Sequence, residues 1–346
     1  MSSRIRYITG VLLVLSLLGT EGLLAKNRKL AQSGFQFLSV VSDARAAALA
    51  DATTSLEVGS SALFFNPAGM ANMTGLVDLT ASTNSWIAEI QHNTFSMAFS
   101  PAHGNYGVIG LSYQNVNYGD FYGTIVNKGI EAGYEDTGIF QLSANAAGLG
   151  YAKRLTDRFS VGGQVRLVTQ DLGESEIPLI TTQTDTLGVA HLDTSSRVVS
   201  NQLSPYAFDF GTQFKTGFKS LVFGMSVRNF SKEIKYVEEG FQLPLVFNLG
   251  ISMDLMDLIG RGSLDQSLYV SLDASHYRSH VEQVKLGIDY RLLRLLSLRG
   301  GYITGNDESG LTFGMGVSHF GFTFDYAFTP YGVFGSVQRM TVRFAL

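Results

Sequence analysis

The sequence contains no cysteine, one tryptophan, only 6 prolines and only 16% charged residues over its 346 positions. Without cysteine there is neither a disulfide framework nor a lipoprotein-type lipid anchor. The charged fraction is well below the roughly 25% of an ordinary soluble domain, yet a mean hydropathy of +0.14 is far too low for a bundle of membrane helices. The formal net charge of −4 comes without a basic stripe, so we expect no nucleic-acid partner.

The N-terminus has the pattern of an exported protein. Arg4 and Arg6 precede the apolar run Ile8–Leu18, which is too short to span a membrane as a helix and is typical of a secretory signal peptide. Small residues allow cleavage after either Gly22 or Ala25. We predict a signal peptide over residues 1–25 and export from the cytoplasm.

The segments Gly321–Pro330 and Val337–Leu346 alternate between large apolar and polar residues with the period of a strand. One face carries aromatic residues and its complement carries charges, including Asp325, Arg339 and Arg343. This pattern is typical of a transmembrane β-barrel, whose outer wall faces lipid and whose lumen is polar. The last strand also resembles the insertion signal read by the outer-membrane assembly machinery.

Alternating segments recur along the chain from Leu76 onward. They number fourteen, an even count as in bacterial outer-membrane barrels: Leu76–Asn84, Asn93–Pro101, Tyr106–Asn117, Ile139–Lys153, Phe159–Asp171, Ser204–Lys215, Ser220–Phe230, Leu243–Asp254, Ser267–Arg278, Glu282–Arg291, Leu296–Thr304, Leu311–His319, Gly321–Thr329 and Val337–Leu346. We therefore predict an all-β fold over residues 76–346, an antiparallel barrel of about 14 strands in the outer membrane of a Gram-negative cell, in contact with outer-membrane lipid.

The predicted connections alternate in length. Tight turns fall on the periplasmic side, whereas Val116–Gly138 and Leu172–Leu203 are predicted to be long polar loops on the outside. Asp257–Gln266 is the one long connection on the periplasmic side. Prolines fall at strand ends, at a helix start or, for Pro178, in a predicted loop, so none should interrupt a strand ladder.

Residue parity assigns a polar set to the lumen. Charges of both signs occur there, which favours paired networks packing a narrow or plugged interior over an ion-selective pore lined by one sign. The candidate lumen network consists of Arg166, Asp209, Arg228, Asp273, Asp289, Arg299, Asp325, Arg339 and Arg343.

No catalytic or metal-binding motif is present. The six histidines are scattered over loops and strand ends, and there is no nucleophile elbow, metalloprotease helix or phosphate loop. We expect no enzyme activity, no metal and no cofactor. Trp86, Tyr118, Tyr122 and Tyr331 lie near predicted strand ends, and we interpret them as residues of the interfacial aromatic belt.

Residues 26–75 differ from the rest because they contain helix formers. Asp43 can cap the alanine-rich run that follows it. A second short helix is predicted where Asn66 would be the N-cap and Pro67 the first helical residue. Helices placed before the first barrel strand favour a small N-terminal hatch or plug.

The run Asp43-Ala44-Arg45-Ala46-Ala47-Ala48-Leu49, followed by Asn66-Pro67-Ala68-Gly69, resembles the N-terminal motif of the PorV/PorQ outer-membrane proteins, relatives of the FadL transporters. Asp43 and Ala50 stand where that family pattern has glycine. The resemblance implies a FadL-like fourteen-stranded barrel with a hatch, in which Asp43, Ala44, Arg45, Asn66, Pro67, Ala68 and Gly69 belong to the hatch.

Three functions follow as hypotheses. The PorV/PorQ resemblance implies binding or shuttling of secreted cargo, through its C-terminal domain, at a type IX secretion system or its surface attachment complex. Outer-loop apolar residues would suit such partners: Ile177, Pro178, Leu179, Ile180, Leu187 and Val189. The alternative is a FadL-like channel for hydrophobic small molecules such as long-chain fatty acids, with a candidate bulge at residues 145–148. A passive structural barrel is the third.

Overall fold

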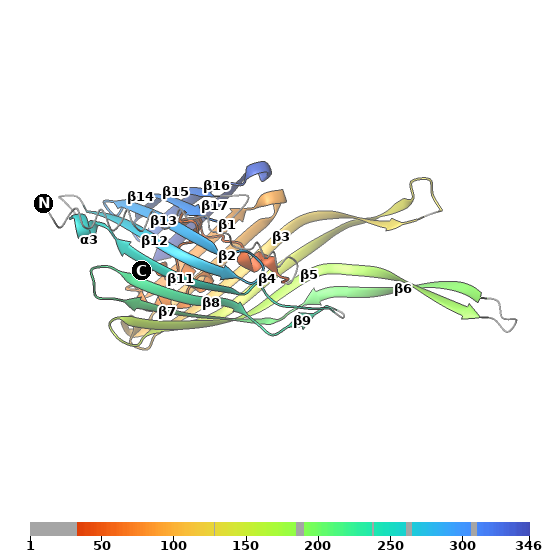
Figure 1. Ribbon diagram of the computed structural model, residues 1–346, viewed down its shortest axis with the longest axis horizontal. Helices are drawn as coiled ribbons and strands as arrows, with labels where there is room; N and C mark the ends of the chain where they lie inside the picture. Colours follow the sequence, from red (N-terminus) through yellow and green to blue (C-terminus); the bar gives the residue numbers. More distant parts are fainter. Residues whose placement is uncertain (1–32, 128, 185–189, 237–238, 261–264, 306–309) are drawn as a thin grey trace.

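The computed structural model describes residues 33–127, 129–184, 190–236, 239–260, 265–305 and 310–346. It is a closed antiparallel barrel of fourteen strands (Figure 1). The predicted signal peptide lies outside the described residues. The barrel strands, in chain order, are β1 (Val77–Ser85), β2 (Gln91–Phe99), β3 (Val108–Val126), β4 (Tyr134–Arg154), β5 (Phe159–Thr184), β7 (Tyr206–Lys215), β8 (Val222–Phe230), β11 (Val246–Asp254), β12 (Gln266–Tyr277), β13 (Gln283–Leu292), β14 (Leu296–Ile303), β15 (Leu311–His319), β16 (Phe322–Pro330) and β17 (Ser336–Ala345).

Each of the fourteen predicted segments overlaps one of these strands, so the predicted fold class is confirmed. The barrel closes where β1 pairs with β17, from Asp78 opposite Ala345 to Ser85 opposite Gln338. Closure leaves no unpaired strand edge in the wall, which is a requirement for strands that face hydrocarbon. Outside the wall are β6 (Ala190–Leu203), β9 (Ile234–Lys235) and β10 (Gly240–Phe241).

The wall has an apolar outer face and a polar inner face. On β16 and β17, Phe324 and Val342 are each 48% exposed, whereas Asp325 and Arg339 are 3% and 4% exposed. Apolar residues exposed on a closed barrel form the surface that meets lipid. The helices of the described part of the chain include none that is long and apolar enough to cross a membrane.

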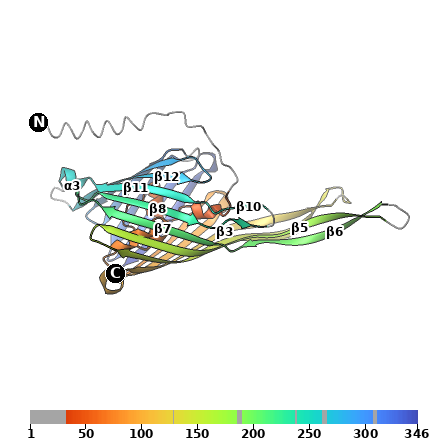
Figure 2. The ribbon, with the colours of Figure 1, turned by 60° about the horizontal axis from the view of Figure 1, so that its bottom comes forward.

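Two hairpins project far beyond one end of the barrel (Figures 1 and 2). They are the β3–β4 hairpin and the β5–β6 hairpin, and we call this end the hairpin end and the opposite one the turn end. Both hairpins were predicted as long loops, and that prediction is wrong. Register shifts between Asn117 and Asp120, and between Asp171 and Glu174, break the alternation from which strands were identified.

Pro178 lies inside β5, opposite Ser196 of β6, and not in a loop. Beyond Asp171, β5 pairs only with β6, so a residue without an N–H is tolerated on the free side. The side chains of residues 176–196, including the apolar loop residues proposed as a partner surface, are outside the described part, as is the placement of Leu187 and Val189.

The predicted bulge at residues 145–148 is also wrong. β4 pairs without interruption on both sides, from Ser143 to Arg154 with β5 and from Ser143 to Ala152 with β3. The parity seemed inverted because Ala144 and Ala146 face inward and pack on an apolar cluster, while Asn145 faces outward and accepts a hydrogen bond from Asn115 Nδ2 at 2.7 Å. The ladder of the wall is instead interrupted between β7 and β8, at Phe208–Phe210.

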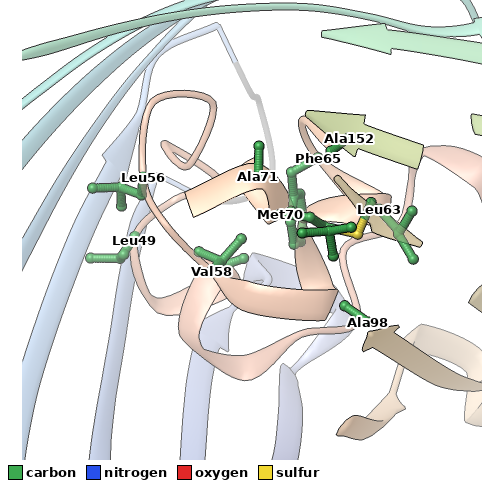
Figure 3. Packing of buried hydrophobic residues seen from close by; sticks show 12 residues of the cluster. Leu49, Leu56, Val58, Leu63, Phe65, Met70, Ala71, Ala98 and Ala152 are labelled. Carbon is green, nitrogen blue, oxygen red and sulfur yellow. The ribbon is translucent and has the colours of Figure 1, made fainter. Parts of the chain in front are cut away.

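Residues 33–75, the inner segment, lie within the barrel. Its helices are η1 (Gln36–Ser39), α2 (Ala44–Ala48), η2 (Gly59–Phe64) and η3 (Pro67–Asn72). Both predicted caps are confirmed: Asp43 accepts from Ala46 N, and Asn66 accepts from Ala68 N. Leu49, Leu56, Leu63, Phe65 and Met70 form a buried apolar cluster (Figure 3). This packing stabilises helices that are too short to be stable alone.

The remaining helices lie in connections: η4 (Ile87–Glu89), η5 (Pro101–Gly104), α3 (Met256–Ile259) and η6 (Gly332–Phe334). Helix α3 occupies the long β11–β12 connection at the turn end. In the inner segment, Ala50 has a φ of 56°, a left-handed conformation that glycine adopts more readily. This is one of the two positions where the family pattern has glycine.

Glycines on the inner wall make room for the inner segment. A Cβ at Gly162 of β5 would lie 2.5 Å from the carbonyl carbon of Pro67, and a Cβ at Gly211 of β7 would overlap the Asn66 side chain. Since backbone approaches backbone here, no larger residue fits without displacement. The η3 helix is therefore docked against β5 and β7 at van der Waals distance.

Candidate functional site

The hairpin end of the barrel contains a cavity of about 820 Å³, the outer cavity. Its walls are mostly apolar and include six aromatic side chains. The apolar residues come from the inner segment, the β1–β2 connection, the roots of the projecting hairpins and the β8–β11 connection: Phe35, Phe37, Trp86, Ile90, Tyr118, Leu172, Tyr236 and Phe241. Polar groups interrupt them, including His92, Gln170 and the acidic side chain of Glu239. A concave apolar space with few polar groups is the usual form of a small-molecule site.

The floor of the outer cavity is the start of the inner segment. Phe35 stacks on Phe241 with 6.2 Å between ring centroids, and Phe241 stacks on Tyr236 at 5.4 Å. Gly34 N donates to Gln242 O at 3.1 Å. Few hydrogen bonds hold this floor, so aromatic packing contributes most of its attachment.

Trp86 and Tyr118 point to the cavity and not to the interfacial belt, which corrects their predicted role. The Trp86 ring packs edge-on against Tyr331 at 5.0 Å, and the Arg339 guanidinium lies over it at 5.5 Å. The guanidinium itself donates to Val41 O at 2.8 Å. Trp86 is thus held by an aromatic contact to the β16–β17 connection and a cation–π contact to β17, and Arg339 links it to the inner segment. Tyr122, by contrast, is 81% exposed on the β3–β4 hairpin.

Beneath the outer cavity, a buried ion pair lies at the interruption of the wall ladder. Arg166 of β5 contacts Asp209 of β7 with N–O distances of 2.8 and 2.9 Å. Arg166 also donates to Asn229 of β8, whose φ is 60° and whose backbone N–H donates to Asp209 at 2.7 Å. The three side chains connect β5, β7 and β8 at the point where the ladder between β7 and β8 is interrupted.

A second network lies toward the turn end, where the inner segment meets β13 and β14. Asp289 receives Arg45 at 3.4 Å, Arg291 at 2.8 Å and Arg299 at 3.1 Å, and Arg299 also contacts Asp325 at 2.6 Å. Asp289 is 1% exposed. One carboxylate shared by three guanidiniums satisfies its lone pairs fully and joins the inner segment to the wall.

Further polar contacts attach the inner segment around the barrel. Arg343 contacts Asp78 at 2.5 Å, and Asp78 accepts from Ser60 N at 2.9 Å. Asp273 accepts from Thr54 N at 2.9 Å. Lys285, which is 2% exposed, contacts Asp51 at 2.8 Å and donates to the Tyr277 hydroxyl at 2.8 Å. These links hold the central part of the inner segment far more firmly than the floor of the outer cavity.

The predicted network residues therefore divide among separate places. Asp289, Arg299 and Asp325 meet one another and Arg45, whereas Arg166 and Asp209 form their own pair. Arg228 lies over the Phe65 ring at 5.8 Å. Among the hatch residues, Ala44 N donates to Thr341 Oγ1 at 2.8 Å, and Pro67, Ala68 and Gly69 are buried in η3.

Sequence reasoning missed the partners supplied by the inner segment and the first strand, Asp51 and Asp78, because their role depends on contacts across more than 200 residues. It also missed the aromatic residues Phe35, Tyr236 and Phe241 of the outer cavity. The only signal for these was their position in connections with unusual aromatic content.

Burial changes the acidity of two groups of the inner segment. Burial raises the pKa of the Asp43 carboxyl. The hydrogen bonds that it accepts from Ala46 N at 2.8 Å and from the Ser61 hydroxyl at 2.9 Å lower this pKa, but by less than burial raises it. Burial, and next the positive charge of Arg291, lower the pKa of Arg45 to about 10 despite Asp289. The surroundings of Arg45 are thus rich in positive charge.

Two smaller cavities open at the turn end, of about 350 and 270 Å³, and charged side chains line both. Among the described residues, no group of three or more histidine, aspartate or glutamate side chains is placed to hold a metal ion.

A closed fourteen-stranded barrel with an apolar outer wall and a polar, filled interior defines the class: a transmembrane β-barrel of the outer-membrane type. No family model matches the chain, and no curated protein matches it. Several solved structures, however, are similar to the chain.

The chain is similar to the Pseudomonas putida toluene transporter TodX (TM-score 0.55, 13% identity, 92% of this chain and 98% of that chain). It is also similar to the CymD monoaromatic hydrocarbon channel (0.54, 11%, 93% and 99%) and to a Pseudomonas aeruginosa FadL homologue (0.53, 10%, 88% and 98%). At these identities the likeness establishes a FadL-like fold, and the PorV/PorQ resemblance stays a prediction.

Proposed function

We propose that the protein is an outer-membrane channel that binds hydrophobic small molecules in the outer cavity and passes them inward. The observation that carries this proposal is the outer cavity itself, about 820 Å³ with mostly apolar walls that include six aromatic side chains. That volume lies within the range of roughly 300–1,000 Å³ typical of small-molecule sites. Since the hairpin end carries the long connections, it faces the cell exterior, so the cavity is accessible to molecules arriving from outside.

Passage requires movement of the inner segment, because the apolar cluster around Leu63 and Met70 fills the barrel below the floor. The floor is the weakest part of that segment. It depends on the Phe35–Phe241 stack and a few hydrogen bonds, whereas buried ion pairs hold residues 45–54. In this proposal a ligand displaces the floor first. The solved structures named above as a toluene transporter and a monoaromatic hydrocarbon channel support the same class of ligand.

The single tryptophan of the chain, Trp86, lines the outer cavity and provides a direct test. Purified protein in a non-ionic detergent is titrated with toluene in one series and with a bromine-labelled long-chain fatty acid in another. We expect saturable quenching by the brominated fatty acid, or a saturable change of Trp86 emission with toluene. The variant Phe241→Ser should weaken binding, whereas Phe320→Ser, an 86% exposed residue at the turn end, should leave it unchanged. Absence of saturation with both ligands would contradict the proposal.

A second candidate function, protein binding, rests on the projecting hairpins. The β3, β4 and β5 strands have 19, 21 and 26 residues, against 8 to 12 in the other barrel strands. Exposed apolar residues lie on the β3–β4 hairpin, among them Tyr122, Val126 and Ile139. Such a surface fits a partner protein, and the PorV/PorQ resemblance names type IX secretion components and cargo C-terminal domains as candidates.

The hairpins can be tested without disturbing the barrel. Residues 121–139 are replaced by a short glycine–serine turn, and the variant is compared with the full chain by cross-linking in its native membrane. Loss of a defined cross-linked protein in the variant, with Trp86 ligand titration unchanged, would support protein binding by the hairpin. An identical cross-linking pattern in both would contradict it.

A further inference from the structure

The smaller cavity at the turn end, about 270 Å³, has an unusual charge composition; we call it the basic cavity. It lies between the inner segment, the β7–β8 turn, and the turn ends of β11, β12 and β13. Its lining includes four cationic side chains and one acidic one: Arg45, Lys215, Lys219, Arg291 and Glu57. The guanidiniums of Arg45 and Arg291 form its inner side, and the two lysines form its rim.

Glu57 is the one acidic side chain that lines the basic cavity. Glu57 pairs with Lys215 at 2.9 Å. Asp289 is shared by three guanidiniums, of which one, Arg299, also uses Asp325. Lys219 is exposed at the rim and has no ion-pair partner among the described residues.

The buried carboxylates of Asp43 and Asp254 line the adjoining cavity of about 350 Å³ together with Arg45 and Arg291. The positive excess is therefore confined to the lining of the basic cavity, where four cationic side chains face Glu57. Two further pairs nearby, Arg294–Asp265 and Arg343–Asp78, balance themselves. Burial and the positive charge of Arg291, with smaller contributions from Arg299 and Arg343, lower the pKa of Arg45. An excess of positive charge partly removed from water requires a counter-charge.

We propose that the basic cavity binds a small oxyanion, a carboxylate or phosphate group, between Arg291, Lys215 and Lys219. The planar guanidinium of Arg291, which is 34% exposed while it contacts Asp289, provides directional donors, and the lysines contribute charge. Bound there, the anion bridges β7 and the β7–β8 turn to β13 of the wall. This site is independent of the outer cavity and of any hydrophobic ligand.

Isothermal titration calorimetry tests the site with inorganic phosphate in one series and acetate in another. Each series uses the full chain in dodecyl maltoside, at neutral pH and constant ionic strength set with chloride. We expect one saturable site per chain for at least one probe, and the probe that binds identifies the oxyanion class. No saturable heat with either probe would overturn the proposal.

Matched variants locate the binding. Lys219→Gln and Arg291→Gln should each weaken the affinity about tenfold, the change expected on losing one charge-assisted hydrogen bond. Arg294→Gln serves as the control, because Arg294 is 85% exposed nearby, pairs with Asp265 and does not line the basic cavity. Lys219 is exposed, so its variant is expected to fold. Equal weakening by Arg294→Gln, or no effect of the two test variants, would overturn the assignment.

Discussion

Asn66 is the residue whose replacement tests the docking of the inner segment most sharply. Its side chain is 2% exposed. Its Nδ2 donates to Thr54 O at 2.7 Å and to Thr212 O of the wall at 3.0 Å, and its Oδ1 accepts from Ala68 N at 3.1 Å. One amide therefore caps η3, closes a loop of the inner segment and attaches both to β7.

Asn66→Ala removes all three contacts. Loss of the cap costs about 1 kcal/mol. The loss of hydrogen bonds to buried groups costs about 1–3 kcal/mol more, limited because Thr54 O keeps a second donor, Gln213 Nε2 at 3.3 Å. A total of about 2–4 kcal/mol raises the equilibrium constant for opening of η3 by roughly 30- to 700-fold. The wall ladder has no part in these contacts apart from Thr212, so the barrel should assemble normally.

Hydrogen exchange followed by mass spectrometry measures how often the backbone amides of residues 59–73 become exposed. Heat-modifiable mobility on a gel reports whether the barrel has assembled. We expect faster exchange in the inner segment with unchanged mobility. Asn115→Ala is the matched control, since its Nδ2 bonds only to Asn145 on the outer face of the wall. Failure of the barrel to assemble in Asn66→Ala, or equal loss of protection in the strands, would refute this account of the docking.

Three further predictions follow from the same contacts. Gly162→Ala should displace the inner segment and raise its hydrogen exchange, at a cost of about 1–3 kcal/mol, whereas Gly163→Ala, whose Cβ would have ordinary contacts of 3.4 Å or more, should not. Burial raises the pKa of Asp43 above its usual 3.8, so the folded state holds this proton more tightly. The stability that this group contributes falls as the pH rises from 3.8 through the raised pKa of the folded state, and it changes no further above that pKa. Asp43→Asn should flatten the dependence of the melting temperature on pH in this window, and an unchanged slope would contradict this. Arg166→Ala should destabilise the barrel by about 3–5 kcal/mol in urea titrations because Asp209 is left buried and unpaired, and Arg166→Ala with Asp209→Ala should recover part of that loss.

The strands of the wall could be predicted from the sequence because each has one face in lipid and one in a polar interior, so the period-two pattern survives. Where an inward face packs on apolar residues, as at Ala144 and Ala146 of β4, the pattern inverts and suggests a bulge that is absent. The projecting hairpins lie outside the lipid, so nothing forces alternation there, and glycines and register shifts made them look like loops.

The caps at Asp43 and Asn66 could also be predicted, because capping is a local interaction between a side chain and the next turn. The polar residues of the lumen were predicted as a set, but not their partners. Arg166 meets Asp209 because β5 and β7 are neighbours in the wall, and Arg45 meets Asp289 because of the place at which the inner segment lies in the barrel. No local sequence pattern encodes either arrangement. The outer cavity was missed for the same reason, since Phe35, Trp86 and Phe241 come from three distant connections.

The central claim is that the barrel binds hydrophobic small molecules. The most direct test is purification of the tagged full chain from its native outer membrane in mild detergent, with mass spectrometry of both the co-eluting proteins and the extracted small molecules. The account predicts a barrel that carries a defined apolar molecule, lost in Phe241→Ser. A barrel that elutes with stoichiometric secreted proteins or translocon subunits, and without an apolar ligand, would contradict it and establish the role in secretion.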